Sequence, residues 1–505
     1  MAEHRPAPQA DLGAVGGPGR YARPAPPGAD PFAPRPGQPG GNRWTVLPCA
    51  LALLGLLAAL GGTLTGGPRL AHGLPLYDWY ALDTALFVLA VLLLRRVPAG
   101  LTVPLVLAGS VAVAAVGLLT PPRTSDDAYR YVWDGRVQAA GLSPYRYAPE
   151  DPALVGLRGP DLFPTGTACT GWDEHRTADG ACTRINRPAV HTIYPPVAEA
   201  WFLAVHPFGG GVRGVQAAGA LLAVATTGAL LLVPRRRRWR AALWGWFPGI
   251  AVWSVNDAHV DTLGALLMVA GLGCAVRGRA GPGGALLGAA VSTKLLPVLA
   301  LPGALSGTLR GFPGRCRTGR GVRRAAVLSG AAVGVFALAY LPYVLLSGAG
   351  VVGYLPGYLR EEGYDQAHVE RFGLLRMLLP DRLAPWGAVL VLGVVVLRVL
   401  RRGDRDRPWG GALLVTGTAL LTVAPSYPWY GLLVVALVAL DGRWEWLAVP
   451  AAGQVLYLLG GDEVQRAAYG AALGVVLAGS LVRRCAARPV AGQREEHEEL
   501  SAVPT

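Results

Sequence analysis

Charged residues are scarce in this sequence, at 15% of 505 residues, against roughly a quarter in soluble globular proteins. No Gly-rich phosphate loop follows a predicted strand, so no nucleotide site is expected. No internal repeat is evident either, which disfavours architectures built on inverted symmetry. Hydrophobic residues make up 52%, and apolar runs recur from Trp44 to Val482 without room for a large soluble domain. The sequence therefore predicts an all-α polytopic membrane protein.

Basic residues outnumber acidic ones by 46 to 32. The arginines fall in short clusters between apolar runs and not on one soluble face, so they indicate cytoplasmic loops and no nucleic-acid partner. This pattern predicts about twelve crossings of the cell membrane, with both termini in the cytoplasm. The candidate spans begin near Trp44, Trp79, Leu101, Val212, Ala241, His259, Ala325, Trp386, Gly410, Trp429, Trp444 and Ala467.

Two further apolar stretches must then fail to cross fully. Residues 195–208 are short and begin with two prolines, which predicts a half-helix that stays on the outer side. Residues 283–305 are interrupted by Lys294 and Pro297 and have basic loops at both ends. This pattern predicts a hairpin that enters from the cytoplasm.

Three regions follow from this reading. Residues 1–43 are a Pro/Gly-rich cytoplasmic tail that cannot bury enough apolar surface to offset its ordering entropy, so it is predicted to be disordered. Residues 44–484 form the membrane domain. Residues 485–505, which end in an acidic segment, are predicted to be a second disordered cytoplasmic tail.

The largest predicted outer loop covers residues 121–194. Of the six cysteines, only Cys169 and Cys182 share a predicted outer loop, where oxidation can hold a disulfide. Two unpaired thiols in an irregular loop are the alternative. Because the predicted outer loop faces an oxidising compartment, we expect the disulfide between Cys169 and Cys182.

The segment from Thr124 to Gln138 directly follows the third span and reads as a helix along the membrane surface. Ser125 is a candidate N-cap, and Asp126 and Asp127 lie where carboxylates complement the helix dipole. A serine followed by two aspartates is also common at the N-terminus of an ordinary helix, so these three residues by themselves do not indicate a site. However, Asp127, Tyr131 and Asp134 share one face at i, i+4 and i+7, with Arg130 beside them. This arrangement makes Asp127, Asp126, Arg130, Tyr131 and Asp134 a candidate site.

A partly desolvated carboxylate at this interface can act as a general base on a hydroxyl group. A nearby arginine and tyrosine can stabilise a phosphate leaving group. Farther along, Gly141-Leu-Ser-Pro-Tyr145 leaves the helix, and Tyr194-Pro195-Pro196 forms a rigid extended turn that would fix the loop at the membrane. Tyr145 and Tyr194 are therefore candidate substrate-binding residues.

The motif Ser-x-Asp-x-Tyr-x-Tyr-x-x-x-Gly from Ser125, then Gly-Leu-x-Pro-Tyr and Tyr-Pro-Pro, resembles bacterial C-type glycosyltransferases (GT-C) that use polyprenyl-phosphate sugars. The nearest branch in this resemblance is the actinobacterial polyprenyl-phosphate-mannose-dependent mannosyltransferases. The specific motifs lie between Ser125 and Val197, with a weaker echo at Ser292–Pro297. Two extra spans precede the loop, whereas many members of the family carry it after the first span.

The resemblance implies a GT-C-like helical bundle and inversion at the anomeric carbon. It also implies that an aspartate in the first large outer loop deprotonates the acceptor. Asp127 occupies that position, with Asp126 as the alternative. The implied partners are a polyprenyl-phosphate hexose donor, with mannose favoured, a glycan or glycolipid acceptor, and membrane lipids. No cofactor or metal is expected.

Polar residues in or beside spans supply further candidates. Polar groups at the membrane-embedded end of a span often mark a substrate path, which makes His259 a candidate substrate-binding residue. Helix capping by Asn256 or Asp257 explains the polar residues of this segment equally well. A metal cluster of Asp257, His259 and Asp261 is a weak alternative. Lys294 would contact the donor phosphate or else snorkel to an interface.

Aromatic and charged residues in two outer segments are weaker candidates. Residues 347–385 carry a mixed polar and aromatic set suited to a sugar acceptor, which a solvated amphipathic loop explains nearly as well. Residues 426–430 would line a lipid-donor groove, although interfacial belt aromatics are the stronger explanation.

Two other functional classes stay open. A transporter or flippase of lipid-linked sugars would need alternating access, usually visible as paired broken helices in matching halves. A polymerase or ligase of lipid-linked glycans shares the large-loop design. The concentration of polar residues in one asymmetric loop favours the transferase.

Overall fold

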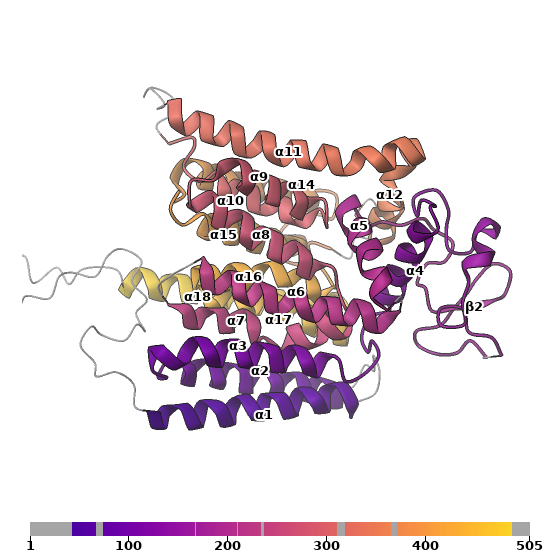
Figure 1. The fold of residues 1–505 in the computed structure, drawn as a ribbon. Coiled ribbons are helices and arrows are strands. Elements are labelled where there is room, and N and C mark those ends of the chain that lie inside the picture. The colour runs from indigo at the N-terminus through magenta and orange to yellow at the C-terminus, as the bar shows by residue number, and fades with distance from the viewer. Residues whose placement is uncertain are drawn as a thin grey trace, which may run out of the picture. The chain divides into compact units, whose positions relative to one another are not determined.

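The computed structural model describes residues 43–66, 74–166, 168–209, 211–233, 237–310, 319–364 and 371–486 (Figure 1). Pro39–Gly479 form one compact unit, and the described part of the other unit is residues 480–486. The predicted tails, 1–43 and 485–505, lie outside the described residues except for Arg43, Cys485 and Ala486.

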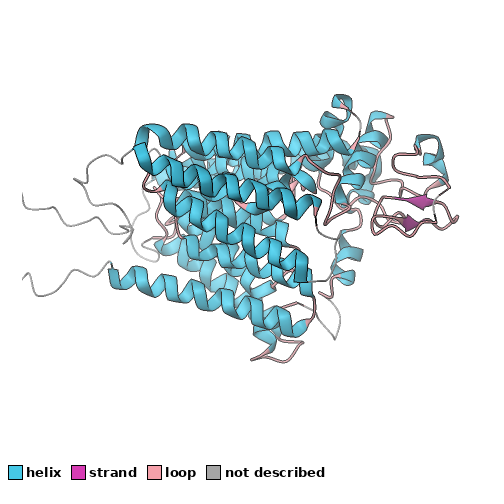
Figure 2. Cartoon of the chain, turned by 90° about the horizontal axis from the view of Figure 1, so that it is seen from below, coloured by secondary structure: helices cyan, strands magenta, loops and turns pink. Residues whose placement is uncertain are grey.

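Most of the described chain is helical, and its one sheet has two short strands, as Figure 2 shows. Among the residues that the structure describes, seven stretches are long and apolar enough to span a membrane. They correspond to the following helices: α1 (Val46–Thr65), α2 (Leu74–Leu94), α3 (Ala99–Gly117), α6 (Val212–Leu232), α11 (Gly319–Ser347), α14 (Ala384–Arg402) and α18 (Asp462–Ala486). An eighth would be the pair η5 (Ile250–Asn256) and α8 (Asp261–Val276), which are bent by 107° at residues 257–260. The fold is that of an all-α polytopic membrane protein.

The twelve predicted spans are not confirmed, because several apolar runs are divided into short pieces. The residue before a proline is disfavoured in an α-helix, and Phe247, before Pro248, interrupts the run that begins near Ala241. The divided or short helices are η4 (Arg238–Ala241), α7 (Ala242–Gly245), α9 (Ala280–Val291), η6 (Leu296–Ala300), α10 (Leu301–Ala304), α15 (Pro408–Val423), η8 (Pro428–Gly431), α16 (Leu432–Asp441), η9 (Trp444–Leu447) and α17 (Ala448–Leu459).

Helix α16 lies in the core of the bundle. Each residue from Leu432 to Leu440 is at most 1% exposed, as expected for a helix that is hydrophobic on all sides. By contrast, α1, α11 and α14 carry exposed large side chains, including Leu54, Leu345 and Leu390 at 59%, 78% and 68% exposure. Such apolar surfaces on the outer helices fit a lipid environment.

Several helix ends that carry arginines lie together at one end of the bundle, here called the arginine face. Arg95 lies over the Trp239 ring, Arg277 donates to the carbonyl of Leu232, and Arg324 donates to the carbonyl of Ala275. Arg240 and Arg407 both donate to the Asp441 carbonyl, which joins η4, α15 and α16. These arginines, which are far apart in the sequence, thus lie close together in space.

The opposite helix ends meet the region of residues 118–195, and this side is here called the loop face. Arg213 donates to the carbonyl of Leu118, and Asn256 donates to the carbonyl of Gly117. In Figure 1, α4, β2, α5 and α12 lie at this end. The elements of the loop face are α4 (Asp127–Ala139), η2 (Pro152–Leu157), β1 (His175–Arg176), β2 (Cys182–Thr183), α5 (Pro196–Val205), η3 (His206–Phe208), η7 (Gly348–Val352), α12 (Leu355–Glu361) and α13 (Gly373–Arg376).

Residues 283–305 form a hairpin, but the sequence predicted one that does not cross fully, whereas the tip of this hairpin reaches the loop face. There, Val197 N donates to the Ser292 carbonyl at 2.8 Å. Its second arm returns to the end of α14, where Gly307 N donates to the Val399 carbonyl. This arrangement brings Lys294, next to the tip, to the same end of the bundle as α4.

Helices α4 and α5 form a second, smaller core on the loop face. Tyr131 stacks on Phe202 with ring centroids 4.4 Å apart, and Trp133 packs edge-on against Phe163. Gly135 allows close approach, because a Cβ there would lie 2.6 Å from the carbonyl oxygen of Phe202. This core fixes the start of α4 relative to the bundle.

Candidate active site

A cavity of about 440 Å³ lies on the loop face. Residues far apart in the sequence line it: the start of α4, the loop before α5, the hairpin tip, α12 and the segment before α16. The polar and aromatic lining residues are Thr124, Ser125, Asp126, Asp127, Arg130, Trp172, Asn186, Arg187, His191, Tyr194, Lys294, Tyr354, Tyr358, Glu362, Tyr364, Arg371, Tyr427, Trp429, Tyr430 and Tyr457.

Two neighbouring carboxylates lie at the start of α4. Asn186 Nδ2 donates to Oδ1 of both Asp126 and Asp127, at 2.8 Å in each case. His175 Nε2 lies 2.7 Å from Asp126 Oδ2, so both oxygens of Asp126 are engaged. Among the described residues, Asp127 Oδ2 accepts no hydrogen bond, and it lies 3.5 Å from His259 Nδ1. Asp127 therefore has the more available carboxylate oxygen.

The buried carboxylate of Asp257 holds the backbone that leads into α4. Its Oδ1 accepts hydrogen bonds from the backbone N–H groups of Arg123, Thr124 and Ser125. Ser125 Oγ accepts from Asp127 N at 3.3 Å, and the helix begins at Asp127 with Asp126 at the N-cap position, one residue later than the sequence suggested. Asp257 thus acts across the bundle on the loop that carries the candidate base, rather than as a cap of its own helix.

Lys294 brings a positive charge to the cavity from the hairpin tip. Its Nζ lies 2.7 Å from Oδ2 of Asp261 and 4.9 Å from the centre of the Tyr430 ring. Lys294 is the only lysine of the chain. Its side chain is 18% exposed, while that of Asp261 is 1% exposed. The ammonium group is thus held at the cavity wall by a buried partner.

Asp127, Tyr131 and Asp134 do share one side of α4, but they have different surroundings. Only Asp127 lines the cavity. Tyr131 is buried against Tyr194 and Phe202, and Asp134 is buried in an ion pair with Arg130. Their side chains support the cavity wall from behind.

The two predicted loop tyrosines also differ. Tyr194 lines the cavity, and burial together with the charge of Asp127 raises its pKa well above the ordinary value, so its phenol stays neutral. Tyr145 does not line the cavity. It donates a 2.6 Å hydrogen bond to the Tyr194 carbonyl and thereby fixes the turn before Pro195.

His259 lies just behind the cavity wall. It is 1% exposed and stacks on Trp429 with ring centroids 3.8 Å apart. Within the described residues neither ring nitrogen has a hydrogen-bond partner. Asp257, His259 and Asp261 face different partners, so they do not converge as metal ligands.

Ion pairs connect α12 and the segment after it to the rest of the cavity. Arg187 Nε and Nη2 donate to the carboxylate of Glu361 at 2.6 to 2.9 Å. Arg371 pairs with Glu362, and Tyr358 shares a hydrogen bond with Tyr430. The predicted acceptor loop at 347–385 thus contributes to the cavity, although His368 and Glu370 lie outside the described residues.

Five of the polar and aromatic lining residues were not singled out from the sequence, namely Trp172, Asn186, Arg187, His191 and Tyr457. The first four lie inside the predicted outer loop, but no local spacing relates them to Asp127. Tyr457 is more than 300 positions away, and its hydroxyl donates to the Thr124 carbonyl. Only tertiary folding reveals these residues.

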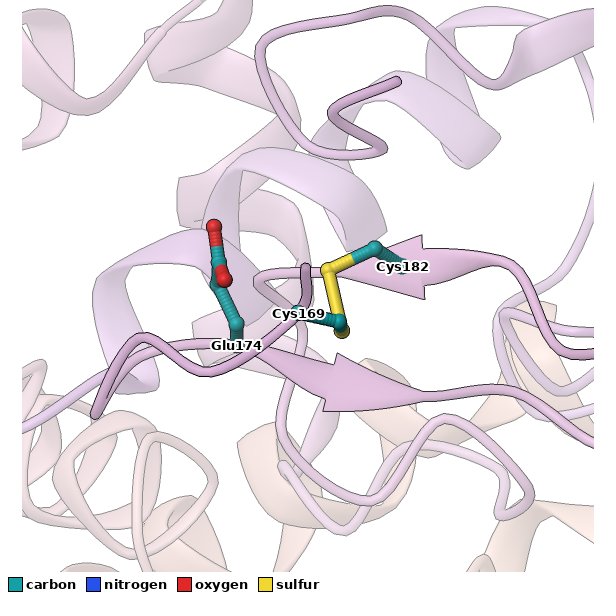
Figure 3. Close-up of side chains that lie close together, drawn as sticks. All are labelled: Cys169, Glu174 and Cys182. Atoms are coloured by element: carbon teal, nitrogen blue, oxygen red, sulfur yellow. A yellow bond between two sulfur atoms is a disulfide. The ribbon is translucent and has the colours of Figure 1, made fainter. Parts of the chain in front are cut away.

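Cys169 and Cys182 form a disulfide in the structure, as the sequence predicted (Figure 3). It closes a hairpin in which β1 and β2 pair antiparallel, with His175 opposite Thr183. Glu174 lies beside the disulfide. Its carboxylate accepts a hydrogen bond from Gly171 N and thereby holds the turn at residues 171–174. The hairpin carries both Trp172 and His175 to the site.

The fold and site define an all-α polytopic membrane protein whose loop face bears a cavity of carboxylates, cations and aromatic rings. Comparisons with protein-family models, curated proteins and solved structures found no match.

Proposed function

We propose that the protein is an inverting membrane glycosyltransferase that moves a hexose, with mannose favoured, from a polyprenyl-phosphate donor to a glycan or glycolipid acceptor. One observation carries this proposal: a single cavity at the end of a membrane bundle combines the available carboxylate oxygen of Asp127 with the cations of Lys294 and Arg130. A base and a phosphate-binding pair are what this transfer needs.

The transfer can be written with these groups. Asp127 takes the proton from an acceptor hydroxyl, whose oxygen then bonds to the anomeric carbon. The bond between that carbon and the phosphate oxygen breaks, and the phosphate leaves with the electron pair. Lys294 and Arg130 stabilise the charge on the departing polyprenyl phosphate.

The lining of the cavity suits both substrates. Leu295, Leu296, Leu355 and Leu359 provide apolar surface for the first prenyl units of the donor. Aromatic rings such as Trp172 provide flat faces for a sugar. In this proposal the loop face lies outside the cell, and the arginine face and both termini are cytoplasmic.

The test is transfer by the purified protein in lipid nanodiscs, with radiolabelled polyprenyl-phosphate mannose, polyprenyl-phosphate glucose and a nucleotide sugar supplied separately. A membrane glycolipid extract serves as the acceptor. Label should move from a polyprenyl-phosphate sugar and not from the nucleotide sugar. Transfer only from the nucleotide sugar, or movement of intact lipid-linked sugar across the bilayer without transfer, would contradict the proposal.

A further inference from the structure

A buried pair of carboxyl groups lies behind the cavity wall, and the proposed chemistry does not use it directly. Asp134 in α4 and Glu199 in α5 are both 0% exposed, and Gln138 Nε2 donates both to the Asp134 carbonyl at 3.2 Å and to Glu199 Oε2 at 2.8 Å, so the two residues are neighbours. Glu199 was not a candidate in the sequence, because it lies within a short apolar helix.

The Asp134 carboxylate fixes the guanidinium group of Arg130. Arg130 Nε donates to both oxygens of Asp134, at 3.0 and 3.1 Å, and Nη1 donates to the Val190 carbonyl at 3.2 Å. Arg130 Nη2 is buried and has no hydrogen-bond partner within the described residues, although Arg130 lines the cavity. The guanidinium group thus has one donor nitrogen left for a ligand.

Glu199 is held in turn by neighbours from three other segments. Thr192 Oγ1 lies 2.6 Å from Glu199 Oε1, and Gln138 Nε2 donates to Oε2 at 2.8 Å. Tyr343 of α11 donates to Gln138 at 2.7 Å. The titratable groups that face this site are Asp134, Arg130, Tyr145 and Tyr343.

The charges of this cluster balance only if one carboxyl group is neutral. Arg130 is a single buried cation, and two buried carboxylates beside it would leave an uncompensated negative charge at a large desolvation cost. Asp134 accepts both hydrogen bonds from Arg130 Nε. The proton therefore belongs on Glu199, where it can be donated to Asp134.

We propose that Glu199 is a positioning residue: its protonated carboxyl group holds Asp134, and Asp134 holds Arg130 with Nη2 free for the donor phosphate. The identity of the ligand rests on the proposed function, whereas the protonation of Glu199 does not. In agreement, burial first and the Asp134 charge second raise the pKa of Glu199 well above its ordinary value.

The first experiment measures thermal unfolding of the full-length protein against pH, comparing wild type with Glu199→Gln. Because the pKa of Glu199 is raised in the folded state, its stabilising contribution is full below the unfolded pKa and is lost as pH rises. Gln mimics the protonated acid and does not titrate. The two Tm values should agree near about pH 5, and the variant should gain about 2 °C or more over wild type near about pH 9.

Glu463→Gln is the matched control, since Glu463 is an exposed glutamate in the first turn of α18. It should follow the wild-type pH curve. If Glu199→Gln also runs parallel to wild type across this range, Glu199 is not protonated and the proposal is overturned.

The second experiment measures the Tm increase produced by decaprenyl phosphate, which reports phosphate binding without sugar transfer. Wild type and Glu199→Gln should bind with affinities within about threefold of each other, whereas Glu199→Ala and Arg130→Met should lose about tenfold or more. Equal affinities of Glu199→Ala and wild type would contradict the positioning role. Binding that depends on Glu199 without any sugar transfer would support this inference while overturning the proposed function.

Discussion

Lys294 Nζ and Asp261 Oδ2 are 2.7 Å apart, which joins the hairpin tip to the start of α8 at the cavity wall. Removing one partner of a buried pair leaves the other charge uncompensated, at a cost of about 3–5 kcal/mol. The partial exposure of Lys294 places the expected cost of its removal at the low end of this range. The effect of this ion pair on stability can therefore be measured separately from the effect of Lys294 on phosphate binding.

Lys294→Met should lower the Tm and abolish decaprenyl phosphate binding. The double variant Lys294→Met/Asp261→Asn should recover most of the stability, because the uncompensated charge is gone, but not the binding. Thermal unfolding with and without the lipid phosphate measures both effects. If the double variant also recovers lipid phosphate binding, Lys294 is purely structural.

The single lysine also permits a labelling measurement. An amine-reactive reagent should modify Lys294 and the N-terminus, and decaprenyl phosphate should slow the labelling of Lys294 but not that of the N-terminus. Peptide mass spectrometry quantifies both sites. Equal labelling of Lys294 with and without the lipid phosphate would place the phosphate elsewhere.

The disulfide hairpin should matter to the site through His175, which contacts Asp126. In Cys169→Ser/Cys182→Ser, loss of the covalent closure is expected to destabilise the folded loop by about 3 kcal/mol. Sugar transfer should fall about tenfold as His175 and Trp172 lose their placement. Cys485→Ser, at an exposed free cysteine, is the control. Unchanged transfer in the double variant would show that the hairpin is dispensable for the site.

Arg187 and Glu361 are each more than a third exposed, so their ion pair should add at most about 1 kcal/mol to stability. Its expected role is to hold α12 against the loop that carries Asn186. Arg187→Ala should therefore raise KM about tenfold with little change in Tm. The swap Arg187→Glu/Glu361→Arg should recover most of that loss. Steady-state kinetics measure this, with Arg158→Ala in a pair away from the cavity as the control.

Much of the fold follows from local physical patterns, and much of the site does not. Apolar runs and proline positions predicted a helical membrane bundle and the hairpin at residues 283–305, while the compartment of the cysteines predicted the disulfide. Helical spacing placed Tyr131 and Asp134 beside Asp127, but spacing alone does not show which side chains a second core buries. Glu199 and Tyr457 reach the region only through contacts between helices distant in sequence, which no local pattern reveals.

The proposed transfer depends on Asp127 as its general base, and sugar transfer from polyprenyl-phosphate mannose by Asp127→Asn measures this dependence. The amide keeps the shape of the side chain but cannot take a proton. The rate should fall by about 100-fold or more while the Tm stays within a few degrees of wild type. Asp179→Asn, an exposed aspartate of the same loop, should transfer normally. Wild-type rates in Asp127→Asn would contradict the account, and loss of transfer in Asp126→Asn alone would assign the base to its neighbour.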